Sequence, residues 1–68
     1  METFAERLKD LRAEKGMSAM ALSKAVEISD ASIINWENNK YDIKAQQLIK
    51  LCKYFNVSAD YLIGLTDY

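Results

Sequence analysis

The chain has 68 residues, half of them hydrophobic and 28% charged, with a formal net charge of −1 and no proline or histidine. This length and balance predict a single small folded domain covering residues 1–68, and they argue against a disordered chain. No apolar run approaches the ~20 residues that a membrane-spanning helix needs. The acidic first residues are also unlike a secretory signal. We therefore expect a cytoplasmic protein that has no membrane partner.

The composition also argues against catalysis and metal binding. The single cysteine, Cys52, cannot form an internal disulfide, and the absence of histidine removes the usual general base and a common metal ligand. No pairing of a nucleophile with a base can be assembled from the remaining residues. We therefore expect no enzyme activity, no catalytic residues, no metal and no cofactor. A net charge close to zero gives no general argument for nucleic-acid binding, so that function needs a motif.

The first predicted helix begins near Thr3 and Glu6, which can form a capping box. Residues 15–16, a lysine and a glycine, supply a cation and a left-handed stop at its other end. Apolar residues recur between these signals at helical spacing: Phe4, Leu8 and Leu11.

Two more helices follow, each with a serine at its start. Ser18 can cap the second helix and Ser29 the third. The inward positions are Leu22 and Val26 in the second helix and Ile33 and Trp36 in the third. Only residues 26–29 connect the two helices, and so short a connection forces them to cross steeply. This arrangement is a helix-turn-helix over about residues 18–38.

The remaining sequence predicts a fourth and a fifth helix. Asp42 is the expected cap of the fourth, and Ser58 of the fifth. The apolar stripe of the fourth helix consists of Leu48, Leu51, Cys52 and Phe55. We expect the far end of the fifth helix to be buried through Leu62, Ile63 and Leu65. The predicted fold is thus all-α and compact, with five helices.

Several stretches, in this order and at this spacing, carry a family resemblance: residues 4–12, residues 15–18, residues 28–29 with 33–38, and residues 51–65. Together they resemble the lambda-repressor-like helix-turn-helix family, also called the Cro/cI or XRE type. The resemblance covers residues 4–66. It implies a five-helix DNA-binding domain that forms a homodimer on a double-stranded DNA operator and is most often a repressor.

Some positions depart from the family pattern. Ala19 stands where a glutamine usually helps to hold DNA, and Ile43 stands near the usual proline. Glu27 occupies the position of the usual turn glycine. A non-glycine residue at positive φ costs roughly 1 kcal/mol or more, so either Glu27 carries that strain or the turn takes another form.

A helical wheel at about 100° per residue places Ile33 and Trp36 on the inner side of the third helix. The opposite side and one flank carry the candidate base contacts, which are Asp30, Ala31, Ile34 and Asn35. Asn35 suits adenine, Ile34 a thymine methyl group and Asp30 a cytosine amine. A structural role stays open at each position. Asn35 can be an ordinary exposed polar residue and Ile34 a single exposed apolar residue. Ala31 can simply favour the helix, and Asp30 can complement the helix dipole.

The candidate contacts to the DNA backbone are Ser18, Asn38, Asn39, Lys40, Tyr41 and Lys44. Ser18 lies at a helix N-terminus, which suits an anion, and the others lie at or beyond the end of the third helix. Ordinary cap and loop roles are the alternative. The resemblance further implies that Arg12 and Glu37 form a largely buried, structural ion pair between the first and third helices.

An apolar surplus at the end of the chain predicts the dimer contact, with Tyr61, Leu62, Leu65 and Tyr68 as contributors. The leading interpretation is a sequence-specific transcriptional regulator, a repressor of phage or bacterial type that binds an inverted-repeat operator as a dimer. The alternative is a protein-interaction or antitoxin-like module with the same fold and weak or no DNA binding. Ala19 and Asp30 favour that alternative, as does the near balance of charge over residues 18–44.

Overall fold

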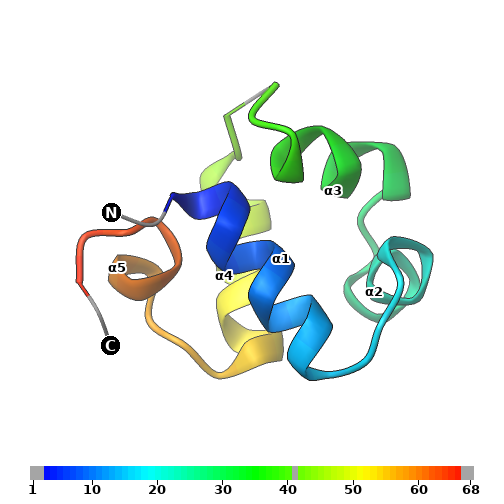
Figure 1. Cartoon of the computed structure of the whole chain (residues 1–68), viewed down its shortest axis with the longest axis horizontal. Coiled ribbons are helices and arrows are strands. Elements are labelled where there is room, and N and C mark those ends of the chain that lie inside the picture. Colours follow the sequence, from blue (N-terminus) through cyan, green and yellow to red (C-terminus); the bar gives the residue numbers. More distant parts are fainter. Residues whose placement is uncertain (1–2, 41, 67–68) are drawn as a thin grey trace.

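The computed structural model describes residues 3–40 and 42–66. These residues form five helices and no strand: α1 (Phe4–Glu14), α2 (Ala19–Val26), α3 (Asp30–Glu37), α4 (Ala45–Phe55) and α5 (Ala59–Leu62). Helix α1 crosses the middle of the molecule in front of α4, with α2 and α3 on one side and α5 on the other (Figure 1). The all-α fold predicted from the sequence is confirmed.

Hydroxyl side chains begin four of the helices, as the sequence predicts. The Oγ atoms of Ser18, Ser29 and Ser58 each accept a hydrogen bond from the backbone N–H three residues later, at 3.0, 3.2 and 3.0 Å. Thr3 Oγ1 accepts from the Glu6 N–H at 3.3 Å and donates to the Glu6 carboxylate, also at 3.3 Å. These bonds satisfy amides that have no partner within the helix, which fixes where each helix starts.

The start of α4 differs from the prediction. Asp42 does not cap this helix, because α4 begins at Ala45 with Lys44 in the cap position and no side-chain cap bond. Ile43 and Lys44 separate Asp42 from the first turn, and the partly buried Ile43 packs against the core. Burial of Ile43 therefore sets the start of α4. The polar cap signal at Asp42 does not.

Each helix contributes one aliphatic side chain to the centre of the core. These side chains are Leu8, Leu22, Ile33, Leu51 and Leu62, all 0% exposed. Trp36 and Phe55 complete the core as predicted, while Cys52 is half-buried at its edge, where burial raises the pKa of the thiol. A domain this small has no reserve core, so truncating any one of these side chains to alanine would cost about 2–5 kcal/mol.

The chain after α5 does not bury its apolar residues as predicted. Only Leu62 is buried, whereas Ile63 is 40% and Leu65 is 74% exposed. Helix α5 ends at Leu62 and the chain turns at Gly64, whose φ is 89°, so helical spacing no longer describes which side chains face inward. The same burial removes Leu62 from the predicted dimer contacts. Tyr68, also predicted there, lies outside the described residues.

Helices α2 and α3 are joined by residues 27–29 alone. Glu27 ends α2 in the left-handed conformation, with φ 57° and ψ 42°, and its N–H donates to the Ser23 carbonyl. The Ile28 N–H donates to the same carbonyl at 3.2 Å, and the Ile28 side chain is buried in the core. Glu27 therefore carries the strain that the family's usual glycine would avoid.

The ion pair between Arg12 and Glu37 joins α1 to the last residue of α3. Arg12 Nε and Nη2 donate to the two Glu37 carboxylate oxygens, each at 2.8 Å. Arg12 Nη1 donates to the Met17 carbonyl at 2.8 Å, so the same guanidinium also holds the segment between α1 and α2. The side chains of Arg12 and Glu37 are 21% and 7% exposed. The hydrogen bonds to Glu37, outweighing desolvation, raise the pKa of Arg12.

Removal of either partner of this ion pair should be strongly destabilising. We expect Arg12→Ala to lower the free energy of unfolding by about 3–5 kcal/mol, because it strands a carboxylate that is mostly buried. Glu37→Ala should cost somewhat less, since Arg12 is the more exposed partner and keeps its bond to Met17. The double variant should lose less than the sum of the two singles. Denaturant unfolding measures all three variants, and additive losses would contradict a direct interaction.

The left-handed residue at the helix-turn-helix offers a second test of the fold. Glu27→Gly should raise the free energy of unfolding by up to about 1 kcal/mol, since glycine adopts this conformation without the steric penalty of a side chain. Asn56→Gly is the matched control. Asn56 has the same φ of 57° at the end of α4, but asparagine tolerates the left-handed region better and should gain less. Equal melting temperatures for Glu27→Gly and the unmodified chain would show that residue 27 is unstrained.

Candidate nucleic-acid interface

Helix α3 lies at the edge of the molecule, and it packs against α1 and α2 (Figure 1). Its inner side chains, Ile33 and Trp36, are 0% and 4% exposed. Ala31 and Ile34 are exposed, and Ile34 reaches 46%, while Asp30 and Asn35 are half-buried. The four candidate base contacts thus lie outside the core. We call Asp30, Ala31, Ile34 and Asn35 the outer face of α3.

Asn35 differs from the other residues of the outer face because its carboxamide has both a donor and an acceptor to offer. Within residues 3–40 and 42–66 the Asn35 side chain makes no hydrogen bond to another protein group. Its backbone carbonyl, in contrast, accepts from the N–H groups of Asn38 and Lys40 at 3.2 and 2.9 Å. The backbone of Asn35 is therefore fixed while its carboxamide remains available.

The candidate backbone contacts lie at three helix ends. Asn38 ends α3, Asn39 follows in the left-handed conformation with φ 58°, and Lys40 comes next, all three exposed. Lys44 is exposed at the start of α4, and Ser18 is exposed at the start of α2. Tyr41, the remaining candidate, lies outside the described residues. The last turn of α3 and the residues after it thus present amide groups and a cation together.

The charges around the helix-turn-helix nearly cancel. The three exposed lysines are equal in number to the carboxylates not paired with an arginine: Lys24, Lys40 and Lys44 against Glu27, Asp30 and Asp42. Glu37 adds no free charge because Arg12 pairs with it. Long-range attraction to a polyanion is therefore weak at this surface, and recognition has to come from short-range contacts.

Sequence reasoning missed Arg7, which is only 4% exposed and is the buried charged residue among the described positions. Its guanidinium donates to the carbonyls of Tyr61 and Thr66, and its Cζ atom lies 4.4 Å from the centre of the Tyr61 ring. The signal was present, because residues 4, 7, 8 and 11 share one face of a helix. An arginine within an apolar stripe has to find partners in the fold.

The sequence analysis also predicted no contact for Tyr54. Its hydroxyl lies 3.4 Å from the Met17 sulfur, and Lys15 Nζ lies 5.2 Å from the centre of its ring. Both contacts join α4 to the segment between α1 and α2. This segment is therefore held from two sides, by Tyr54 and by Arg12.

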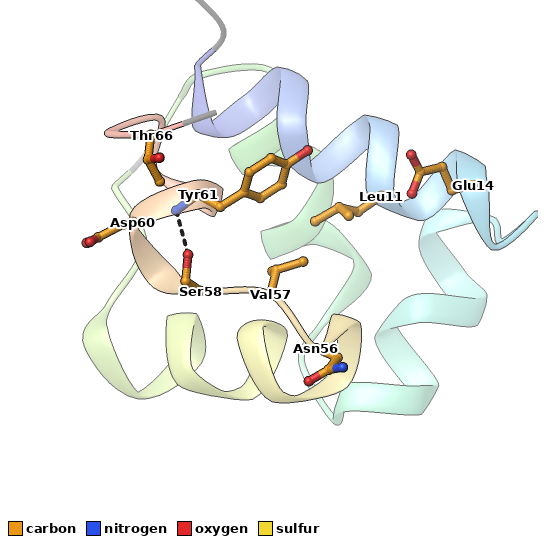
Figure 2. Close-up of a pocket in the computed structure, with 8 residues that line it drawn as sticks. All are labelled: Leu11, Glu14, Asn56, Val57, Ser58, Asp60, Tyr61 and Thr66. Carbon is orange, nitrogen blue, oxygen red and sulfur yellow. Dashed lines mark hydrogen bonds between the residues drawn. The ribbon is translucent and has the colours of Figure 1, made fainter. Parts of the chain in front are cut away.

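An open cleft of about 680 Å³ lies away from α3, between α1 and the segment that contains α5. It is lined by Leu11, Glu14, Asn56, Val57, Ser58, Asp60, Tyr61 and Thr66 (Figure 2). Among the described residues, no group of three histidine, cysteine, aspartate or glutamate side chains gathers to hold a metal ion. The described helices also include none that is long and apolar enough to cross a membrane.

Comparison with known proteins places this arrangement in a family. A family model described as a helix-turn-helix domain matches residues 5–67. The HTH-type transcriptional regulator ImmR of Bacillus subtilis is 31% identical over 62 residues, which cover 91% of this chain and 49% of ImmR. The HTH-type transcriptional regulator PrpR of Mycobacterium tuberculosis is 34% identical over 61 residues, which cover 90% of this chain and 13% of PrpR. The chain thus spans half or less of the length of these relatives.

Solved structures share the fold as well. The P22 c2 repressor in complex with a synthetic operator superimposes with a TM-score of 0.87 at 28% identity, covering 94% of this chain and 97% of the repressor chain. A transcriptional regulator from Listeria innocua gives a TM-score of 0.83 at 26% identity, with coverages of 91% and 58%. The sequence match over residues 5–67 and the shared five-helix fold agree, and this chain belongs to the XRE-type helix-turn-helix family.

Proposed function

We propose that this chain binds double-stranded DNA sequence-specifically through α3 and represses transcription as a homodimer on an inverted-repeat operator. The observation that carries the proposal is the outer face of α3, where an available carboxamide lies beside exposed aliphatic side chains. The likeness to the P22 c2 repressor, whose structure was determined with a synthetic operator, supports it. The proposed role needs no catalysis, metal or cofactor, and it is exercised on DNA in the cytoplasm.

In the proposed complex α3 enters the major groove, where its outer face meets the base edges. Asn35 pairs with an adenine through its carboxamide, whose N–H donates to adenine N7 and whose oxygen accepts from the adenine N6 amine. Ile34 and Ala31 contact apolar groups such as a thymine methyl. Asp30 lies at the N-terminal end of α3, where a carboxylate either accepts from a cytosine amine or complements the helix dipole.

Backbone contacts flank the groove in this proposal. Ser18 offers a helix N-terminus to one phosphate. Asn38, Asn39, Lys40 and Lys44 meet phosphates beyond the other end of α3, and Tyr41 remains an expected contributor. Contacts of this kind position the protein on the duplex and carry no sequence information themselves.

A second copy of the chain meets the first, we infer, through the turn that follows α5. Ile63 and Leu65 expose large apolar side chains there, 40% and 74% exposed. Ile63 also borders a hollow shared with Phe4, Trp36 and Ile43. A patch this small gives weak association in free solution, so the dimer would form mainly on DNA. Two recognition helices about 34 Å apart then occupy successive major grooves and block access by polymerase.

Selection of bound DNA from a random-sequence pool tests the function. We expect enrichment of one inverted repeat whose half-sites are about one helical turn apart. A pool that stays random, together with tight binding to a protein partner, would instead support the interaction-module alternative. Ala19 and the balanced charges of the helix-turn-helix favour that alternative.

The role of Asn35 in base recognition can be measured on the selected operator. Asn35→Ala should weaken binding by about 1–3 kcal/mol and relax the preference at one adenine, because the bidentate pair is lost. Asn56→Gly, at the end of α4, is the control: it also removes a carboxamide, glycine tolerates the left-handed backbone there, and binding should be unchanged. Affinities for the operator and for each of its single-base substitutions give the answer. A uniform loss over all sequences would place Asn35 on the DNA backbone instead.

The lysines beyond α3 should contribute affinity without specificity. Lys40→Ala or Lys44→Ala should weaken binding to all sequences equally and lower the slope of log affinity against log salt by about one. Lys53→Ala on α4 removes the same charge from an exposed position elsewhere and should change neither quantity. Titrations at several salt concentrations measure the slope. A changed base preference in a lysine variant would show that another face of α3 lies in the groove.

A further inference from the structure

Arg7 occupies a position in α1 where an aliphatic residue would be expected. Its neighbours on the same face, Leu8 and Leu11, are 0% and 7% exposed, and Arg7 itself is 4% exposed. A guanidinium always carries its charge, and burial of that charge is unfavourable unless well-placed acceptors surround it. The reason for an arginine here therefore lies in the acceptors that it reaches.

Two backbone carbonyls at the end of the described chain accept hydrogen bonds from Arg7. Arg7 Nη1 donates to the Tyr61 carbonyl at 2.8 Å and also to the Thr66 carbonyl. The guanidinium also lies over the Tyr61 ring, with 4.4 Å between Cζ and the ring centre. Figure 2 shows the Tyr61 side chain reaching from α5 towards α1, with Thr66 near the same side of α5. One side chain of α1 thus holds the chain at both residue 61 and residue 66.

These two anchor points bracket the apolar turn at residues 63–65. The turn is closed within itself, because the Gly64 N–H donates to the Tyr61 carbonyl at 3.1 Å and the Leu65 N–H donates to the Asp60 carbonyl at 2.8 Å. Gly64 is buried with φ 89°, whereas the residues on either side of it, Ile63 and Leu65, are exposed. Ile63 and Leu65 are therefore both exposed on the same hydrogen-bonded turn, one on each side of Gly64.

We propose that Arg7 is a positioning residue for self-association, fixing the turn at residues 63–65 so that Ile63 and Leu65 meet a second copy of the chain. The inference rests on the proposed dimeric binding to an operator. A contact patch that is already ordered loses less conformational freedom when the partner arrives, so the association is tighter. Lysine cannot substitute fully, because its compact, strongly hydrated ammonium does not stack on the Tyr61 ring as the planar guanidinium does.

The position of Arg7 separates this role from DNA recognition. In Figure 1 α5 and α3 lie on different sides of α1, and the Arg7 contacts reach residues 61 and 66, neither of which is a candidate DNA contact. Loss of the Arg7 contacts should therefore leave the binding of one chain to one half-site intact. Only the cooperativity between two half-sites should fall.

The experiment compares binding to a full inverted repeat and to an isolated half-site, both taken from the selected operator. The variants are Arg7→Lys, Leu65→Ala and the combination of the two, with Lys9→Ala as the control because Lys9 is exposed on the same helix. We expect Arg7→Lys to lower cooperativity about tenfold, equivalent to about 1.4 kcal/mol, with half-site affinity unchanged. Leu65→Ala should have a similar effect, and the combination should add little to it. Lys9→Ala should resemble the unmodified chain.

Amide hydrogen exchange supplies a readout that does not depend on DNA. In Arg7→Lys the amides of Gly64 and Leu65 should exchange faster, while those of Leu22 and Ile33 in the core stay protected. This pattern also shows that the variant is folded. If all amides lose protection together, Arg7 is a general stabiliser and the proposal is wrong.

The remaining outcomes separate this proposal from the proposed function. If the unmodified chain binds the full repeat no more cooperatively than two independent half-sites, dimeric operator binding is wrong and the role of Arg7 falls with it. If the unmodified chain is cooperative and Arg7→Lys is equally so, only the role of Arg7 is overturned. An equal fall in half-site and full-site affinity would likewise overturn it.

Discussion

The paired hydrogen bonds between Arg12 and Glu37 are the constraint on which the arrangement of helices depends. Besides the packing of Ile33 and Trp36 in the core, helix α3 is held at its start by the connection through residues 27–29 and at its end by Glu37. A largely buried ion pair contributes little net stability compared with a well-packed apolar pair, because both charges lose their hydration. Its geometry, however, admits one relative placement of α1 and α3. The pair therefore acts chiefly by fixing the orientation of the outer face of α3.

Two arginines of helix α1 hold two different parts of the chain in place. Arg12 holds the end of α3 and the Met17 carbonyl, whereas Arg7 holds the carbonyls on either side of the turn after α5. Five residues of a helix correspond to a rotation of about 140°, so the two guanidinium groups leave α1 in different directions. One helix thereby sets both the surface proposed to read DNA and the surface proposed to meet a second chain.

Local signals in the sequence predicted most of the fold. The hydroxyl caps at Ser18, Ser29 and Ser58 depend only on residues a few positions away, and the sequence contains those residues. The start of α4 was wrong because burial of Ile43, a tertiary effect, overrides the local signal at Asp42. Burial of Leu65 was also wrong, since helical spacing was extended past a turn that the sequence does not mark strongly.

The candidate site was less predictable than the fold. A helical wheel separates the inner and outer faces of α3 because burial follows the helical period. The partners of Arg7 lie 54 and 59 residues away along the chain, and no spacing rule reaches that far. The ion pair at Arg12 and Glu37, 25 residues apart, was implied only by the family resemblance. Contacts between distant side chains need the fold before they can be deduced.

The balanced charge of the helix-turn-helix has a consequence for how a regulator of this kind would select its site. Non-specific affinity for DNA comes mainly from cations that neutralise phosphates, and here carboxylates offset the lysines. Little of the protein would then be held on unrelated sequence. Two weak half-site contacts that are joined by a dimer contact bind far more tightly than either alone, because the second contact forms at a high effective concentration. On the proposed mode, occupancy of the operator would rise steeply with protein concentration. Selectivity would come from two base contacts, one by Asn35 of each chain, that form together because the turns at residues 63–65 join the two chains.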